Sequence, residues 1–270
     1  MLNSNEYYLK YLHLCDRYFE FDKNKIPLCA AENYISDFVY NNVKLWEGKY
    51  CLSLNNFQPQ SDFIGAKFIN ELLQLTIEIC NKIFKSTYSN PKTLSGMNCF
   101  TTTALACISI CKNRNALVTS PDSGGHQSIP QILSLLGFNV EFMPYNYEKY
   151  DIDYNGINHI LNTKSYGLIV FAQSDVLQQP NIDLLNIPND SIVIYDATQT
   201  LGLIAAELTF NPLLAAHQNI ILIGGTHKTF PGPSCGLIMT NNTNLANKID
   251  KYILGIYIYQ FYLRDLYYSS

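Results

Sequence analysis

Short apolar segments alternate with helical segments from residue 116 onward, and this alternation restricts the fold more than any other feature of the chain. Helices are predicted at residues 128–136 and 154–161. Strands are predicted at residues 116–119, 139–142, 167–171, 192–195, 220–223 and 236–239. Strands separated by helices form a mostly parallel sheet that is covered on both sides. The sequence therefore predicts an α/β fold with a mostly parallel central sheet and helices on both faces.

The chain before residue 116 is predicted to hold an arm, a loop and two helices. Apolar residues recur at spacings of three and four from Phe68 to Phe84, which is typical of a helix with one buried face. Asn90 and Pro91 are predicted to break this helix. The remaining expectations are an arm helix at residues 7–19, an extended segment at 26–36, a loop at 52–62 and a second helix at 102–111.

A lysine lies shortly after the predicted strand at residues 220–223. Two glycines follow the strand, and after them comes Lys228, next to His227 and between two threonines. A lysine delivered by a strand suits a Schiff base with an aldehyde cofactor, because a semi-buried site lowers the pKa of the amine and leaves it free to attack. The same window also fits a surface lysine in a loop.

An aspartate ends the strand predicted just upstream of the lysine. Asp196 follows four apolar residues and precedes Lys228 by about thirty positions. A carboxylate there can pair with a pyridine nitrogen and keep it protonated, although an isolated aspartate more often caps a helix or forms a turn. Because ligands collect at the carboxyl ends of parallel strands, the order and spacing of the two residues favour pyridoxal 5'-phosphate as cofactor.

Two further turns belong to the same set. Ser95 and Gly96 open a helix, and free backbone N–H groups at a helix start suit a phosphate monoester; a plain serine N-cap explains them equally. Gly124 and Gly125 precede His126 after the strand at 116–119. Glycines let the backbone approach a ligand closely, and the histidine ring could stack on a flat cofactor or simply be exposed.

Composition excludes several classes of partner. Charged residues make up 15% of the chain, the net charge is −4, and no basic stripe appears, so nucleic acid is not expected as a partner. No segment approaches the length and apolarity of a membrane span. The eight cysteines are scattered without a Cys-x-x-Cys pair, which indicates a reducing compartment and no metal site. We expect a cytoplasmic protein without a membrane partner.

Five motifs in order resemble those of the serine hydroxymethyltransferases, a family of fold type I pyridoxal-phosphate enzymes. The I-x-L-I-A-S-E-N-Y motif corresponds to residues 26–34, and the phosphate-binding Ser-Gly-Ser-Gln to residues 95–98. The A-H-G-G-H loop is similar to residues 123–126. The V-D-M-A-H-x-A-G-L-(I/V)-A-A stretch parallels residues 195–206, and T-H-K-T-L-x-G-P matches residues 226–233. The resemblance runs in register from about residue 25 to residue 250.

The resemblance implies a role for each matched position. Lys228 would form the Schiff base, Asp196 would meet the pyridine nitrogen, and His126 would stack on the ring as a third catalytic residue. The implied cofactor-binding residues are Ser95, Gly96, Gly125, His126, Asp196, Gln199, Thr226, His227 and Lys228. Tyr50 resembles the tyrosine that reaches the neighbouring subunit's site, and Glu32 and Ser174 are further candidates for contact with substrate.

The chain also departs from the family pattern. The family's acidic residue two positions after Tyr50 is Leu52 here, and the histidine of the D-x-A-H run is Gln199. We expect an arm at residues 1–24, a pyridoxal-phosphate domain at 25–250 and the start of a connecting helix at 251–270. The C-terminal domain, which carries the arginine that clamps the substrate carboxylate, is expected to be missing, and none of the three arginines takes its place.

The resemblance implies an enzyme that labilises bonds at the α-carbon of a small amino acid, by glycine–serine interconversion or related aldol cleavage or transfer. Tetrahydrofolate is the family's one-carbon carrier, and Leu52 argues against folate-dependent turnover. The alternative is a catalytically degenerate protein that serves as a subunit or binding partner of a full-length relative. Because family members are homodimers with shared sites, the implied partner is a second copy or another chain of this fold.

Overall fold

The computed structural model describes residues 4–23, 25–26, 32, 34–43, 50–51, 67–174, 178–257 and 261–262. Its helices are α1 Ser4–Asp22, α2 Asp37–Val43, α3 Lys67–Phe84, α4 Gly96–Ile108, α5 Ser128–Leu135, α6 Tyr154–Thr163, α7 Leu201–Ala205 and α8 Thr243–Tyr257. Its strands are β1 Tyr50–Cys51, β2 Tyr88–Thr93, β3 Asn115–Val118, β4 Asn139–Phe142, β5 Tyr145–Asn146, β6 Asp151–Ile152, β7 Leu168–Phe171, β8 Ile192–Asp196, β9 Ile220–Gly225, β10 Gly236–Thr240 and β11 Phe261–Tyr262.

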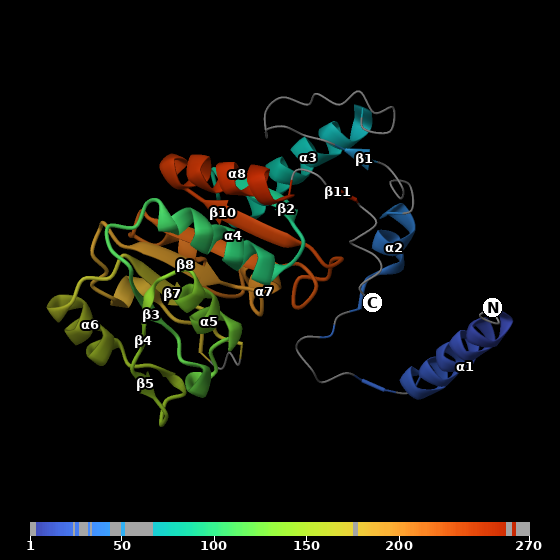
Figure 1. Ribbon diagram of the computed structural model, residues 1–270, viewed down its shortest axis with the longest axis horizontal. Coiled ribbons are helices and arrows are strands. Elements are labelled where there is room, and N and C mark those ends of the chain that lie inside the picture. The colour runs from blue at the N-terminus through green and yellow to red at the C-terminus, as the bar shows by residue number, and fades with distance from the viewer. Residues whose placement is uncertain are drawn as a thin grey trace.

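Seven of these strands form one central sheet in the order β2-β10-β9-β8-β7-β3-β4 (Figure 1). The pairs from β4 through β3, β7 and β8 to β9 are parallel. β10 runs antiparallel to both of its neighbours, β9 and β2. The expected α/β fold with a mostly parallel sheet is confirmed.

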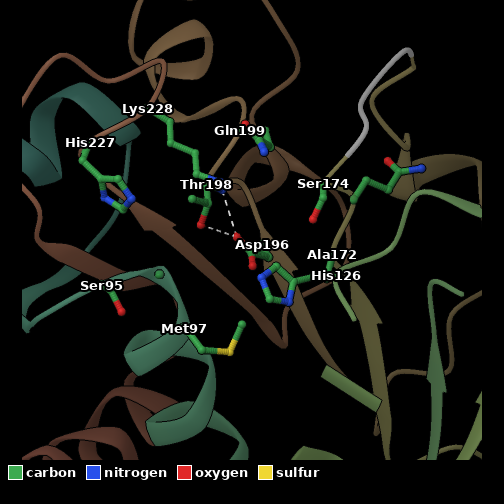
Figure 2. Close-up of a pocket in the computed structure, with 12 residues that line it drawn as sticks. Ser95, Met97, His126, Ala172, Ser174, Asp196, Thr198, Gln199, His227 and Lys228 are labelled. Carbon is green, nitrogen blue, oxygen red and sulfur yellow. Dashed lines mark hydrogen bonds between the residues drawn. The ribbon is translucent and has the colours of Figure 1, made fainter. Parts of the chain in front are cut away.

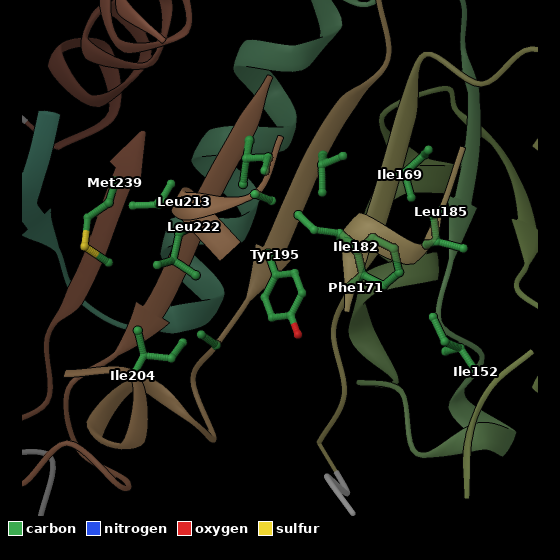
Figure 3. Packing of buried hydrophobic residues seen from close by; sticks show 14 of the residues in the cluster. Ile152, Ile169, Phe171, Ile182, Leu185, Tyr195, Ile204, Leu213, Leu222 and Met239 are labelled. Carbon is green, nitrogen blue, oxygen red and sulfur yellow. The ribbon is translucent and has the colours of Figure 1, made fainter. Parts of the chain in front are cut away.

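Alternate residues of the central strands enter two separate cores, one on each face of the sheet. In β9, Ile220 and Leu222 pack into one core, whereas Ile221 and Ile223 pack into the other. The helices α3, α6 and α7 cover the first face, part of which Figure 3 shows. The helices α4, α5 and α8 cover the second. Burial on both faces explains why these strands are continuous apolar runs rather than alternating ones.

The first edge of the sheet is a strand that was not predicted. Asn90 and Pro91 were predicted to break the helix before them; α3 ends at Phe84, ahead of this dipeptide, and both residues lie within β2. β2 is an edge strand, where a residue without an N–H group is tolerated. Its pairing with β10 also shifts register between Gly236 and Ile238, opposite this proline. The dipeptide therefore lies in an irregular edge strand that begins after the helix has ended.

The helix after β2 corrects one prediction. It was expected at residues 102–111 but begins at Gly96, because the side chain of Ser95 caps it by accepting a hydrogen bond from the N–H of Asn98 at 3.2 Å. The short helices α2 and α7 were not predicted. The helices predicted at 7–19 and 68–84 are confirmed as α1 and α3. The predicted loop at 52–62 lies outside the described residues, as does most of the segment at 26–36.

Candidate active site

A pocket lies where the carboxyl ends of β7, β8 and β9 meet the loop after β3 and the first turn of α4 (Figure 2). Parallel strands gather their carboxyl ends at one edge of a sheet, so side chains distant in sequence meet there. The pocket is lined by Ser95, Gly96, Met97, His126, Ala172, Gln173, Ser174, Asp196, Thr198, Gln199, His227 and Lys228.

Asp196 is the last residue of β8 and is held by the turn that follows. Its Oδ1 accepts hydrogen bonds from the N–H of Thr198 at 2.9 Å and from the hydroxyl of Thr198 at 2.6 Å. Burial raises the pKa of Asp196, and the bonds from Thr198 and the nearby His126 and Lys228 oppose this effect. The carboxylate is thus enclosed and faces two basic side chains.

The lysine loop, residues 226–235, joins β9 to β10. Thr226 folds this loop by hydrogen bonds from its hydroxyl to the carbonyls of Pro233 and Cys235 and from its N–H to Cys235 at 3.0 Å. These bonds direct His227 and Lys228 into the pocket. Burial lowers the pKa of His227, and the charge of Lys228 lowers it further, so the neutral imidazole is favoured.

The loop after β3 brings His126 to the opposite wall. The N–H of His126 donates to the carbonyl of Ala172 at 2.9 Å, and the N–H of Ser174 donates to the carbonyl of Gly124 at 2.7 Å. A Cβ atom on Gly125 would lie 2.5 Å from the carbonyl oxygen of Thr119, so this loop can press against the end of β3 only with glycine there.

The first turn of α4 forms the floor of the pocket. A Cβ atom on Gly96 would lie under 3.0 Å from Oγ1 of Thr198 and 3.2 Å from the backbone nitrogen of Gly225. The glycine therefore lets the start of a helix approach the ends of β8 and β9. Free N–H groups and the positive end of the helix dipole are features that bind anions.

Most of the predicted site residues meet in this pocket. Ser95, Gly96, His126, Ser174, Asp196, Gln199, His227 and Lys228 all line it. Gly125 and Thr226 shape the loops behind the lining rather than the lining itself. Glu32 is exposed to solvent and is not part of the pocket wall, and the side chain of Tyr50 lies outside the described part of the chain.

Sequence reasoning missed four lining residues, namely Met97, Ala172, Gln173 and Thr198. Ala172 and Gln173 follow a predicted strand directly, so the rule about carboxyl ends could have found them. Met97 stands inside the Ser-Gly-x-x motif. Nothing in the sequence singled out Thr198, because a threonine two positions after an aspartate is an ordinary turn pattern.

The pocket wall contains polar atoms that the described residues do not satisfy. Oε1 of Gln199, Oε1 of Gln173 and Nδ1 of His227 are buried without a hydrogen-bond partner among those residues. Buried polar atoms are usually paired, so these three are suited to a polar ligand. His, Cys, Asp and Glu side chains of the described residues form no cluster of three that could hold a metal ion. None of the described helices has the length and apolarity to cross a bilayer.

Two curated relatives are described as serine hydroxymethyltransferases. The serine hydroxymethyltransferase of Archaeoglobus fulgidus is 27% identical over 243 residues, which cover 85% of this chain and 52% of the relative. The serine hydroxymethyltransferase of Orientia tsutsugamushi is 29% identical over 234 residues, which cover 84% and 53%. The chain thus spans about half the length of these curated relatives.

A solved structure agrees in fold. An L-threonine transaldolase from Pseudomonas fluorescens matches with a TM-score of 0.78 and 18% identity, covering 98% of this chain and 62% of that one. At this identity the likeness shows the fold alone. The family model for serine hydroxymethyltransferase matches residues 10–259, most of the sequence. The chain therefore belongs to the serine hydroxymethyltransferase family.

Proposed function

We propose that this chain binds pyridoxal phosphate in the pocket and acts on bonds at the α-carbon of a small amino acid. The observation that carries the proposal is the convergence of a lysine, a partly buried aspartate, a histidine and a helix start on one pocket. Each group matches one part of the cofactor. Lys228 offers an amine for the aldehyde, Asp196 a carboxylate for the pyridine nitrogen, and Gly96 a backbone N–H for the phosphate.

The chemistry of the pocket fits this cofactor. Oδ1 of Asp196 accepts two hydrogen bonds from Thr198, whereas Oδ2 accepts none from the described residues. Oδ2 can therefore accept a hydrogen bond from a protonated ring nitrogen. The first turn of α4 can hold the dianionic phosphate. The buried, unpaired Oε1 of Gln199 and Nδ1 of His227 add polar partners that the protein itself leaves unused.

Pyridoxal phosphate supplies an electron sink that weakens the bonds at the α-carbon of a bound amino acid. The protein's own part is to place the charges around it. The carboxylate of Asp196 would hold a proton at the ring nitrogen, and His126 would form the wall beside the ring. Among the described residues that line the pocket, Lys228 has the one lysine amine, and this amine would accept and return protons there.

The substrate and partner are the finer parts of this proposal. A small amino acid suits a pocket walled by Ser174, Gln199 and His227, with glycine–serine interconversion or aldol cleavage as the reaction. Exposed apolar side chains on α1, such as Tyr7, Leu14 and Phe19, support association with a second copy or another chain of this fold.

Borohydride trapping tests cofactor binding. The protein is mixed with pyridoxal phosphate, reduced with borohydride and mapped by peptide mass spectrometry, and we expect the cofactor's mass on Lys228. Lys228→Ala should lose both this label and the visible absorption of the complex. Lys251→Ala, which changes an exposed lysine on α8, should behave as wild type. Labelling spread over surface lysines, with no preference for Lys228, would overturn the proposal.

Exchange of the α-proton separates an enzyme from a degenerate subunit. The loaded protein is incubated with glycine in deuterated water and followed by proton NMR. An active site exchanges one α-proton, and Lys228→Ala does not. If wild type binds the cofactor at Lys228 but exchanges no proton, the subunit role is favoured, and the mass in analytical ultracentrifugation with a full-length family member checks it.

A further inference from the structure

Thr198 touches three elements of the pocket at once. Its hydroxyl donates to Oδ1 of Asp196 at 2.6 Å, a bond that Figure 2 shows. The hydroxyl also accepts a hydrogen bond from the N–H of Gly225, at the end of β9, at 3.1 Å. The same oxygen lies against Gly96 at the start of α4. One side chain therefore connects the aspartate of β8, the strand that leads to the lysine loop and the proposed phosphate-binding turn.

The direction of the two hydrogen bonds follows from chemistry. The N–H of Gly225 can only donate, so the oxygen of Thr198 must accept there. The single hydroxyl proton is then available for Asp196, whose ionised carboxylate can only accept. The backbone N–H thus donates to the hydroxyl, and the hydroxyl donates to the carboxylate. In such a chain of hydrogen bonds, each bond polarises the next.

We propose that Thr198 is a positioning residue of this site, whose hydroxyl relays a hydrogen bond from Gly225 to Oδ1 of Asp196 and thereby orients the carboxylate with Oδ2 free for a ligand. The inference rests on the proposed function, because the ligand of Oδ2 would be the pyridine nitrogen. It concerns a residue that the motifs did not single out, since the corresponding position of the V-D-M-A-H motif is alanine.

The surroundings show why this carboxylate needs such support. Burial favours its protonated form and raises its pKa, and the hydroxyl and N–H of Thr198 are the largest of the effects that lower it again. The titratable groups that face Asp196 are His126 from the loop after β3, Lys228 from the lysine loop and Cys99 from α4. His126 and Lys228 also favour the ionised form.

The methyl group of Thr198 holds the hydroxyl in place. Its Cγ2 lies 3.2 Å from the position that a Cβ atom would take on Gly225 and 3.4 Å from that on Gly96. A β-branched side chain packed on two sides has little freedom at χ1. Serine would keep the hydroxyl but lose this restraint, whereas valine would keep the shape and lose both hydrogen bonds.

Thr240 provides a matched control at the other end of the sheet. Its buried hydroxyl also donates to an oxygen, the carbonyl of Ile220 at 2.7 Å, and also accepts from a backbone N–H, that of Asn242 at 3.1 Å. Thr240→Val thus removes the same two kinds of bond far from the pocket. It controls for the loss of stability that Thr198→Val causes by the same chemical change.

The first test uses the protein without cofactor, so it does not depend on the proposed function. The carboxyl carbon of Asp196 is followed by NMR during a pH titration, with Asp196→Asn to assign the signal. Thr198→Val should raise the pKa of Asp196, Thr198→Ser should restore most of the wild-type value, and Thr240→Val should leave it unchanged. An unchanged pKa in folded Thr198→Val would overturn the relay.

The second test measures the dissociation constant of pyridoxal phosphate against pH. Thr198→Val loses one hydrogen bond to a charged group. At pH values near the pKa of Asp196, its dissociation constant for pyridoxal phosphate should therefore be at least about tenfold higher than that of wild type. The loss should shrink at higher pH, where the carboxylate is ionised in both proteins. An equal loss at every pH would reduce Thr198 to a structural residue and contradict the inference. If wild type binds no cofactor, the proposed function fails while the NMR result still decides the relay.

Discussion

The hydroxyl of Thr198 packs against Gly96 where a side chain would otherwise lie, since a Cβ atom on the glycine would be under 3.0 Å from Oγ1 of the threonine. The side chain of Thr198, in the turn after β8, therefore lies directly against the backbone of the first residue of α4. This contact joins the proposed phosphate-binding turn to the proposed ring-binding aspartate. A substitution at either residue should consequently alter both the proposed phosphate-binding turn and the position of Asp196.

Gly96→Ala should weaken the site from the side of α4. Alanine favours a helix over glycine by up to about 1 kcal/mol, but the added methyl group would collide with Thr198 and crowd the backbone nitrogen of Gly225. Overpacking of this kind costs about 1–3 kcal/mol. We expect a lower free energy of unfolding and weaker binding of pyridoxal phosphate, measured by urea unfolding and absorbance titration.

Thr101→Ala is the control for Gly96→Ala. Thr101 lies one turn further along α4, and its hydroxyl bonds the carbonyl of Met97 within the helix. This variant should bind the cofactor as wild type does. If Gly96→Ala also binds the cofactor as wild type does, the start of α4 can accommodate a methyl group and does not hold the phosphate.

Asp196→Asn should stabilise the cofactor-free protein at neutral pH. Burial raises the pKa of Asp196 above that of the unfolded chain, so between the two values the folded state binds more protons. The free energy of unfolding therefore falls as pH rises through this window. The variant lacks this dependence, and its advantage over wild type should vanish below the unfolded pKa. Urea unfolding at several pH values measures the difference.

Asp190→Asn should show the opposite dependence. The hydrogen bond from Lys112 lowers the pKa of the exposed Asp190, so its contribution is present at neutral pH and is lost on acidification. Destabilisation by Asp196→Asn at neutral pH would show that the carboxylate contributes to folding and is not held at a cost for binding a ligand.

The sequence predicted the central sheet well because its strands are buried on both faces. Runs such as Ile220–Ile223 are apolar throughout and mostly β-branched, and helical spacing separates them from their neighbours. The ends of these strands then placed Asp196 and Lys228 at one edge, which the structure shows. Local pattern and tertiary burial agree at these positions, and this agreement is what makes them predictable.

The parts that were missed depend on contacts between distant segments. β2 carries Asn90 and Pro91, and its place in the sheet follows from pairing with β10 about 150 residues later. α4 begins at Gly96, which is buried and lies against Thr198 and Gly225, two residues far along the chain. The role of Thr198 depends on Gly225, a partner in another strand. Periodicity within a short window contains no information about such pairs.

Asp250→Ala should destabilise the fold through the link between α8 and β2. Oδ1 of Asp250 accepts hydrogen bonds from the hydroxyl of Tyr88 and from the amide of Asn90 at 3.0 Å. Asn90 is fully buried and its amide also donates to the hydroxyl of Tyr88 at 3.1 Å, so the change removes the charged one of these two partners, which water cannot readily replace. A buried group left unsatisfied costs about 1–3 kcal/mol. Urea unfolding should show this loss, and Asp190→Ala, which breaks an exposed ion pair, should have a much smaller effect.

Gly202→Ala should disturb the lysine loop from the side of α7. A Cβ atom on Gly202 would overlap with the backbone carbonyl of Thr229, the residue after Lys228. Thr229 is also hydrogen-bonded to the start of α7. Its hydroxyl accepts a hydrogen bond from the N–H of Gly202 at 3.2 Å and donates one to the carbonyl of Gln199 at 2.9 Å. The loop must therefore move, since backbone atoms cannot turn away as a flexible side chain can.

The result should be a lower yield of borohydride-trapped cofactor on Lys228 and a loss of about 1–3 kcal/mol in the free energy of unfolding. Leu203→Ala changes the next residue of α7, which is 39% exposed, and should leave the trapping yield as in wild type. Because the two variants differ by one position on the same helix, a fall in yield only in Gly202→Ala would trace the effect to the contact with Thr229. Equal yields in both would show that the lysine is positioned without support from α7.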